Sequence, residues 1–137
     1  MKLKTLIVDD ELPARENLKL LLHEHCPDID VVGTADGVTS ALKLITELKP
    51  EVLFLDIRMP SGAEGFDLLS KIPEKNFQVV FVSAYKDYAL RAFHVNAIHY
   101  ILKPIDIKVF PDQIRQFCEQ TRKDEQHGTT TEDPGSG

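Results

Sequence analysis

The stretch from Val52 to Pro60 constrains the fold more than any other part of the chain. Four consecutive large apolar residues, Val52-Leu53-Phe54-Leu55, lead directly into Asp56 and, a few residues later, into Pro60. A strand that is apolar on both faces must be covered on both, as is the central strand of a parallel sheet flanked by helices. Asp56 would then lie at the carboxyl edge, where open α/β sheets bind ligands. Alternatively, Asp56 only turns the chain before Pro60.

The rest of the chain alternates short β-rich runs with longer helical patterns. Strands are predicted over residues 3–8, 30–35, 52–55, 77–82 and 98–102. Helical patterns follow them: one begins near Pro13, one stops before Pro50, and others cover 66–72, 88–93 and 107–117. The last helix is expected to bury Ile107, Phe110, Ile114 and Phe117.

These five strand–helix units, without an internal repeat, predict a single α/β domain. The simplest arrangement is an open, doubly wound, five-stranded parallel sheet with helices on both faces, flavodoxin-like in its strand order 2-1-3-4-5. In that order the first and third strands flank the point where the winding reverses. The polar residues after these two strands should therefore lie close together.

Composition narrows the class of function. The 137 residues carry a formal net charge of -6 and contain no basic stripe, which argues against tight binding of nucleic acid by this chain alone. A metal cation or a positively charged partner is the more compatible ligand. The apolar run before Asp9 is too short for a signal peptide, and no apolar stretch could span a membrane, which predicts a cytoplasmic protein. Cys26 and Cys118 lie far apart without a metal-binding spacing, so they are expected to be reduced thiols without chemistry.

Polar residues end four of the five predicted strands. They are Asp9 and Asp10 after the first strand, Asp56 after the third, Ser83 after the fourth and Lys103 after the fifth. Three carboxylates at one edge would repel one another without a cation, and oxygen ligands of this kind suit Mg²⁺. A metal beside Asp56 with a lysine opposite favours phosphoryl transfer to that carboxylate. Taken singly, each residue could instead cap a helix, form a turn or lie solvated on the surface.

With these motifs in place, the chain resembles the receiver domains of two-component response regulators. The matching segments are Asp9-Asp10-Glu11, Leu55-Asp56-Ile57-Arg58-Met59-Pro60, Val82-Ser83-Ala84 and Lys103-Pro104. The resemblance spans residues 3 to about 122 and implies a CheY-like fold, with a receiver domain over 1–122. Residues 123–137 have no apolar residue to bury and are expected to form a disordered tail or linker remnant.

The resemblance also implies a role for each site residue. Asp56 would be the phosphoacceptor for a histidine kinase, Asp10 a direct Mg²⁺ ligand, Asp9 a ligand through water, and the carbonyl of Arg58 a further ligand. Ser83 and Lys103 would contact the phosphoryl group, and Tyr100 would be the switch aromatic. Such a domain is a signalling phosphoacceptor rather than an enzyme with an external substrate.

The stretch from Ser83 to Phe93, with Asn96-Ala97 and Tyr100-Ile101-Leu102-Lys103-Pro104, resembles the LytR/AlgR branch. Receivers of this branch usually precede a LytTR DNA-binding domain, which these 137 residues do not include. The resemblance implies that activation pairs two copies through the surface of the fourth helix, fifth strand and fifth helix. Transcription would then be controlled only through the missing domain.

Two departures from the family and two alternatives remain open. The loop between Pro60 and Gly65 is one residue longer than is usual, and Pro111 is unusual in a last helix. One alternative is a phosphatase resembling the haloacid dehalogenases, but Arg58 stands where those enzymes have their general acid. The other is a binding-only receiver that is never phosphorylated, although all of the acidic, hydroxyl and lysine positions are filled.

Overall fold

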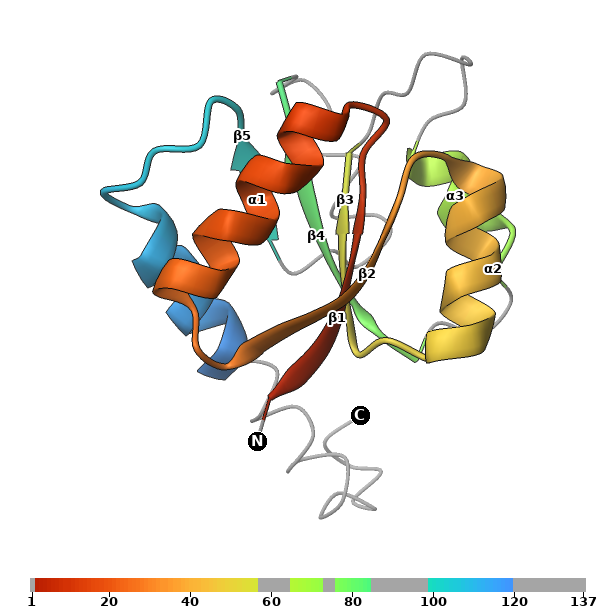
Figure 1. The fold of residues 1–137 in the computed structure, drawn as a ribbon, viewed down its shortest axis with the longest axis horizontal. Coiled ribbons are helices and arrows are strands. Elements are labelled where there is room, and N and C mark those ends of the chain that lie inside the picture. Colours follow the sequence, from red (N-terminus) through yellow and green to blue (C-terminus); the bar gives the residue numbers. More distant parts are fainter. Residues whose placement is uncertain (1, 57–64, 73–75, 85–98, 120–137) are drawn as a thin grey trace, which may run out of the picture.

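The computed structural model describes residues 2–56, 65–72, 76–84 and 99–119. Within these ranges the chain forms a five-stranded sheet of order β2-β1-β3-β4-β5, in which every neighbouring pair is parallel (Figure 1). The strands are β1 Leu3–Val8, β2 Ile29–Ala35, β3 Val52–Leu55, β4 Gln78–Ser83 and β5 His99–Leu102. The helices are α1 Leu12–His25, α2 Val38–Leu48, α3 Gly65–Ser70 and a C-terminal helix over 110–119. The predicted fold and strand order are confirmed.

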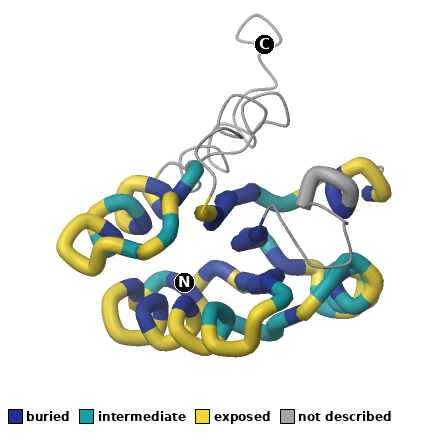
Figure 2. The backbone as a smooth tube through the Cα atoms, turned by 90° about the horizontal axis from the view of Figure 1, so that it is seen from above, coloured by how far each residue is buried: buried dark blue, intermediate teal, exposed yellow. Residues whose placement is uncertain are grey.

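The sheet separates two hydrophobic cores. On one face, α1 and the C-terminal helix pack over Val52 and Phe54 of β3, whereas α2 and α3 pack over Leu53 and Leu55 on the other (Figure 1). All four β3 residues are at most 1% exposed, as the unbroken apolar run predicted. Seen from above, the strands are mostly buried and the helices turn exposed residues outward (Figure 2). Burial of apolar surface on both faces thus fixes β3 at the centre.

Prolines set the ends of the first two helices where the sequence indicated. Pro13 lies in the first turn of α1, where its missing N–H costs no helical hydrogen bond, and α1 ends at His25, before Pro27. The second helix, α2, ends at Leu48, and Lys49 then adopts a left-handed conformation with φ 48° ahead of Pro50. Both helices therefore return the chain to the amino end of the next strand.

The prediction for the last helix was wrong at Ile107. Phe110, Ile114 and Phe117 are buried as expected, but Ile107 is 59% exposed and lies in a turn before the helix. The backbone N–H of Lys108 donates to the Asp106 carboxylate in this turn, which delays the helix to residue 110 and puts Pro111 in its first turn. Pro111 is thus accommodated without a break.

Some predictions lie outside the described residues. These are the helix over 88–93, the longer loop after Pro60, Arg58 and the tail over 123–137. The helix predicted over 66–72 is shorter than expected, because α3 ends at Ser70, although Leu68, Leu69 and Ile72 are all buried. Among the described residues, no helix is both long enough and apolar enough to cross a membrane.

Candidate functional site

Sheet pairing brings the ends of β1 and β3 to one point. Val8 and Leu55 are partners across the two strands, so Asp9 and Asp56 follow side by side. The backbone N–H of Asp56 donates to the carbonyl of Val8 at 2.9 Å, and that of Asp9 donates to the carbonyl of Ala35 at 3.0 Å. The ladder therefore continues one residue past each strand and holds both aspartates at the carboxyl edge.

Three carboxylates meet at this edge. Asp9, Asp10 and Asp56 each place one carboxylate oxygen within 4.8 Å of the others, and among the described residues no other group of acids, histidines and cysteines gathers so closely. The side chains of Asp9 and Asp56 are only 7% and 9% exposed, and Asp10 is half-buried. Two unit charges at such a distance repel by about 1 kcal/mol in water and roughly 3 kcal/mol near a protein surface. A hard divalent cation fits this all-oxygen donor set.

Lys103 supplies a positive charge to the cluster. Its ammonium donates a hydrogen bond of 2.8 Å to Asp9 Oδ2 and lies 3.6 Å from Asp56 Oδ2. Its backbone N–H donates to the carbonyl of Ser83, and a cis peptide bond joins it to Pro104. Burial lowers the pKa of Lys103, but the hydrogen bond to Asp9 and the charges of Asp56, Asp9 and Glu11 outweigh that effect and raise it above its ordinary value. Lys103 therefore stays charged and offsets part of the carboxylate repulsion.

Asp9 is held by protein groups at both carboxylate oxygens. Oδ1 accepts the backbone N–H of Glu11 at 2.9 Å, and Oδ2 accepts the Lys103 ammonium. The Asp9 carbonyl also accepts the guanidinium of Arg15 at 2.7 Å. Arg15 was not predicted as a site residue. Its spacing from Asp9, six residues along the chain, gives no sign that the two groups meet.

Ser83 and Tyr100 lie on one face of the sheet beside the cluster. Ser83 ends β4 and is fully buried, and it pairs in register with Leu102, while Tyr100 pairs with Phe81. The Tyr100 ring lies 6.2 Å from that of Phe81, and Tyr100 is half-buried. Since alternate residues share a face, Ser83 and Tyr100 are diagonal neighbours on β4 and β5. The structure thus brings together six of the seven predicted site residues at or beside one edge, and the seventh, Arg58, is outside the described residues.

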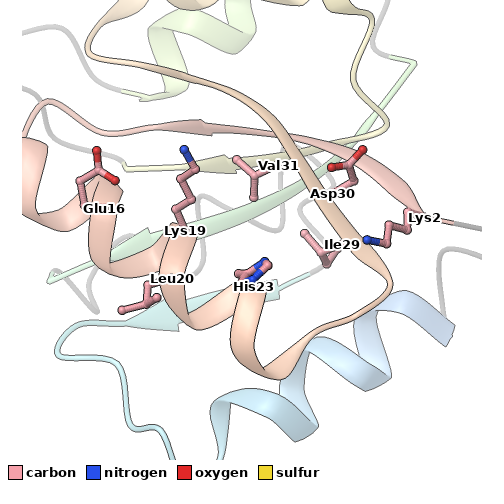
Figure 3. Close-up of a pocket in the computed structure, with 8 residues that line it drawn as sticks. All are labelled: Lys2, Glu16, Lys19, Leu20, His23, Ile29, Asp30 and Val31. Carbon is pink, nitrogen blue, oxygen red and sulfur yellow. The ribbon is translucent and has the colours of Figure 1, made fainter.

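Two cavities were not foreseen. One of about 440 Å³ adjoins the carboxylates: Asp9 and Lys103 line it, together with apolar side chains such as Leu18, Val82 and Ile105. Another, of about 360 Å³, lies between the outer side of α1 and the edge strand β2 (Figure 3). Its lining mixes both charge signs, with Glu16 and Lys19 on α1, and contains none of the predicted site residues. Of these two cavities, only the first is lined by predicted site residues, namely Asp9 and Lys103.

Comparison with known families matches this arrangement to one of them. The family model for the response regulator receiver domain matches residues 5–115, which include all of the predicted site residues. The chain belongs to the response regulator receiver domain family. It is therefore a signalling domain rather than an enzyme that turns over an external substrate.

Known proteins similar to this receiver domain agree with the assignment. It is 45% identical over 122 residues to an uncharacterized response regulatory protein of Vibrio cholerae, which covers 88% of this chain and 51% of that protein. It is 45% identical over 106 residues to the transcriptional regulatory protein BtsR of Escherichia coli K12, over 76% of this chain and 43% of BtsR. The receiver domain thus spans about half the length of these relatives.

Solved structures show the same fold. The response regulatory domain of mrkE from Klebsiella pneumoniae matches with a TM-score of 0.78 at 30% identity, over 88% of this chain and 98% of that one. The receiver domain of AraT from Geobacillus stearothermophilus matches with a TM-score of 0.74 at 27% identity, over 95% and 100% of the two chains. The strand order found here is therefore that of experimentally determined receiver domains.

Proposed function

We propose that Asp56 accepts a phosphoryl group from the phosphohistidine of a sensor histidine kinase, with Mg²⁺ bound beside it. The observation that supports this most is the meeting of Asp9, Asp10, Asp56 and Lys103 at the carboxyl edge of the sheet. In the transfer, a carboxylate oxygen of Asp56 forms a bond to phosphorus while the bond from phosphorus to the imidazole nitrogen breaks. Membership of the receiver family supports a histidine kinase as the donor.

The contacts of the carboxylates support a division of roles. Both oxygens of Asp9 already accept protein donors, so Asp9 suits contact with the metal through water. Asp10 and Asp56 would bind Mg²⁺ directly, with the carbonyl of Arg58 as a further ligand. Bound Mg²⁺ would neutralise charge on the transferring oxygens and so allow them to approach Asp56.

Lys103 and Ser83 would hold the phosphoryl group once it is transferred. The Lys103 ammonium lies 3.6 Å from the Asp56 carboxylate. After the transfer it could therefore replace its contact with that carboxylate by a hydrogen bond to a phosphoryl oxygen with only a small movement. The Ser83 hydroxyl, at the end of the next strand, would donate a hydrogen bond to another phosphoryl oxygen. Arg58 stands two residues after Asp56, where phosphatases resembling the haloacid dehalogenases carry their general acid, and this argues against rapid release of the phosphate.

The test is the intact mass of the chain after incubation with Mg²⁺ and acetyl phosphate. We expect the wild type to gain one phosphoryl group and Asp56→Asn to gain none. Asp30→Asn is the matched control, because Asp30 is an exposed aspartate on β2 away from the cluster, and it should be labelled like the wild type. Labelling of Asp56→Asn at the wild-type rate would refute the assignment.

The output of the receiver domain is part of the same proposal. A phosphoryl group adds about 1.5 to 2 negative charges and draws the Ser83 hydroxyl toward it. Tyr100, diagonal to Ser83 on the same face, would then turn inward and change the surface that pairs two copies. Sedimentation with and without beryllofluoride tests this: activation should increase the dimer fraction in wild type and much less in Ser83→Ala. Equal responses would exclude coupling through Ser83.

In a full-length protein we expect this dimerisation to control transcription from the cytoplasm. The relatives are about twice as long as the matched region, and BtsR is named a transcriptional regulatory protein, which supports an output domain after the receiver. The motifs around Ser83 and Lys103 favour a LytTR DNA-binding domain in that place. Residues 1–122 would then be the receiver and 123–137 the start of a linker.

A further inference from the structure

The two cysteines, far apart in the sequence, meet in one cavity. Cys26 caps the end of α1, and Cys118 lies on the C-terminal helix; they are 5% and 3% exposed. Both line a cavity of about 230 Å³ between these two elements, remote from the carboxylates. Its other lining residues include exposed ones, such as Pro27 and Arg115, so the buried thiols form the floor of a cavity whose rim is at the surface.

The local backbone directs both side chains into this cavity. Pro111, Ile114 and Cys118 are spaced by three and four residues along the C-terminal helix, so they share the face that lines it. Opposite them, the backbone N–H of Cys26 donates to the carbonyl of Leu22, and its carbonyl accepts the N–H of Ile29. These hydrogen bonds fix the turn that carries Cys26 against the helix face that carries Cys118.

Electrostatics agrees with this proximity. Burial, then the neighbouring Cys118, then Asp28 raise the pKa of the Cys26 thiol to about 11. Both thiols also belong to the same hydrophobic core. The raised pKa also means that Cys26 is protonated at neutral pH, so weak oxidants react with it slowly.

We propose that Cys26 and Cys118 are a site of oxidative modification, at which a thiol oxidant joins them as an intrachain disulfide. Each thiol loses its proton and the pair gives two electrons to the oxidant, for example a diazene such as diamide, which becomes the hydrazine as the S–S bond forms. The bond would tie the end of α1 to the C-terminal helix. This modification requires neither Mg²⁺ nor phosphorylation of Asp56.

The experiment treats the 137-residue chain with diamide at alkaline pH and then alkylates it with N-ethylmaleimide in denaturant. We expect the reduced wild type to take up two alkyl groups and the oxidised monomer none, with a peptide map that links the segments holding Cys26 and Cys118. Cys26→Ala and Cys118→Ala should each keep one alkylatable cysteine in the oxidised monomer. Alanine is chosen because both positions are buried and it leaves no unsatisfied polar group.

Dilution separates the proposal from crosslinking between molecules. An intrachain bond forms at a rate that does not change with protein concentration, whereas crosslinks between chains slow on dilution and give dimers on a non-reducing gel. If the wild-type monomer keeps both thiols, or loses them only as crosslinked dimers, the proposal is wrong. Oxidation can also be repeated on Asp56→Asn, where the same result is expected because the two sites are separate.

Discussion

Replacement of Lys103 by methionine tests the electrostatics of the cluster. The substitution keeps the apolar stem but removes the cation that lies 2.8 Å from Asp9 and 3.6 Å from Asp56. The Coulomb attraction of each ion pair is about 1 kcal/mol with the dielectric constant of water and up to roughly 6 kcal/mol with that of a protein surface. Part of this attraction is offset by the desolvation of the Lys103 side chain, which is 24% exposed. Breaking a fully buried pair costs about 3 to 5 kcal/mol. For this partly exposed one we expect a loss of about 2 to 3 kcal/mol in the free energy of unfolding.

The measurement is urea unfolding of wild type and Lys103→Met in EDTA and in excess Mg²⁺. Magnesium should restore much of the lost stability, because it supplies positive charge to the same carboxylates. Lys108→Met is the matched control; Lys108 is exposed, and its loss should cost less than about 0.5 kcal/mol. A Lys103→Met variant as stable as wild type in EDTA, or equally destabilised with and without Mg²⁺, would refute the reasoning.

Three other outcomes are expected. The pKa of Lys103 is raised above its ordinary value of 10.5, so the stability that Lys103 contributes should be complete below about pH 10.5. This contribution should be lost as the pH rises through the pKa of the folded state. Urea unfolding curves of wild type and Lys103→Met should therefore converge only at higher pH. Asp10→Ala should abolish the rise in melting temperature that Mg²⁺ gives the wild type, and an unchanged rise would remove Asp10 from the ligand set. Phe54→Ala should cost about 3 to 5 kcal/mol in urea unfolding, because Phe54 is 1% exposed and packs edge-on against Phe117, whereas Leu20→Ala, at a 53% exposed position, should cost less than about 0.5 kcal/mol.

Much of the fold could be predicted because local signals and burial agree in this chain. The apolar run in β3 required cover on both faces, and the prolines after α1 and α2 ended those helices where the chain must return to the sheet. Ile107 was misplaced because its apolar side chain fits the helical period, whereas a hydrogen bond from the backbone N–H of Lys108 to the Asp106 carboxylate forms the turn that keeps Ile107 out of the helix. Periodicity alone does not detect such a local contact.

The candidate site was predictable to the extent that strand ends share one edge. Asp9, Asp56 and Lys103 each follow an apolar run directly, and Asp10 comes next after Asp9, so parallel pairing was enough to bring them together. The hydrogen bond from Arg15 to the Asp9 carbonyl depends on how α1 packs against the sheet edge. The proximity of the two cysteines depends on how the end of α1 packs against the C-terminal helix. Such contacts are set by tertiary packing, which residue spacing does not encode.

The most direct test of the central claim identifies the residue that carries the phosphoryl group. Borohydride reduces an aspartyl phosphate to homoserine, so reduction after incubation with acetyl phosphate, followed by peptide sequencing, marks the acceptor permanently. We predict homoserine at position 56 alone, present with Mg²⁺ and absent with EDTA. Homoserine at Asp9 or Asp10 instead, or labelling of position 56 that is equal in EDTA, would contradict the account.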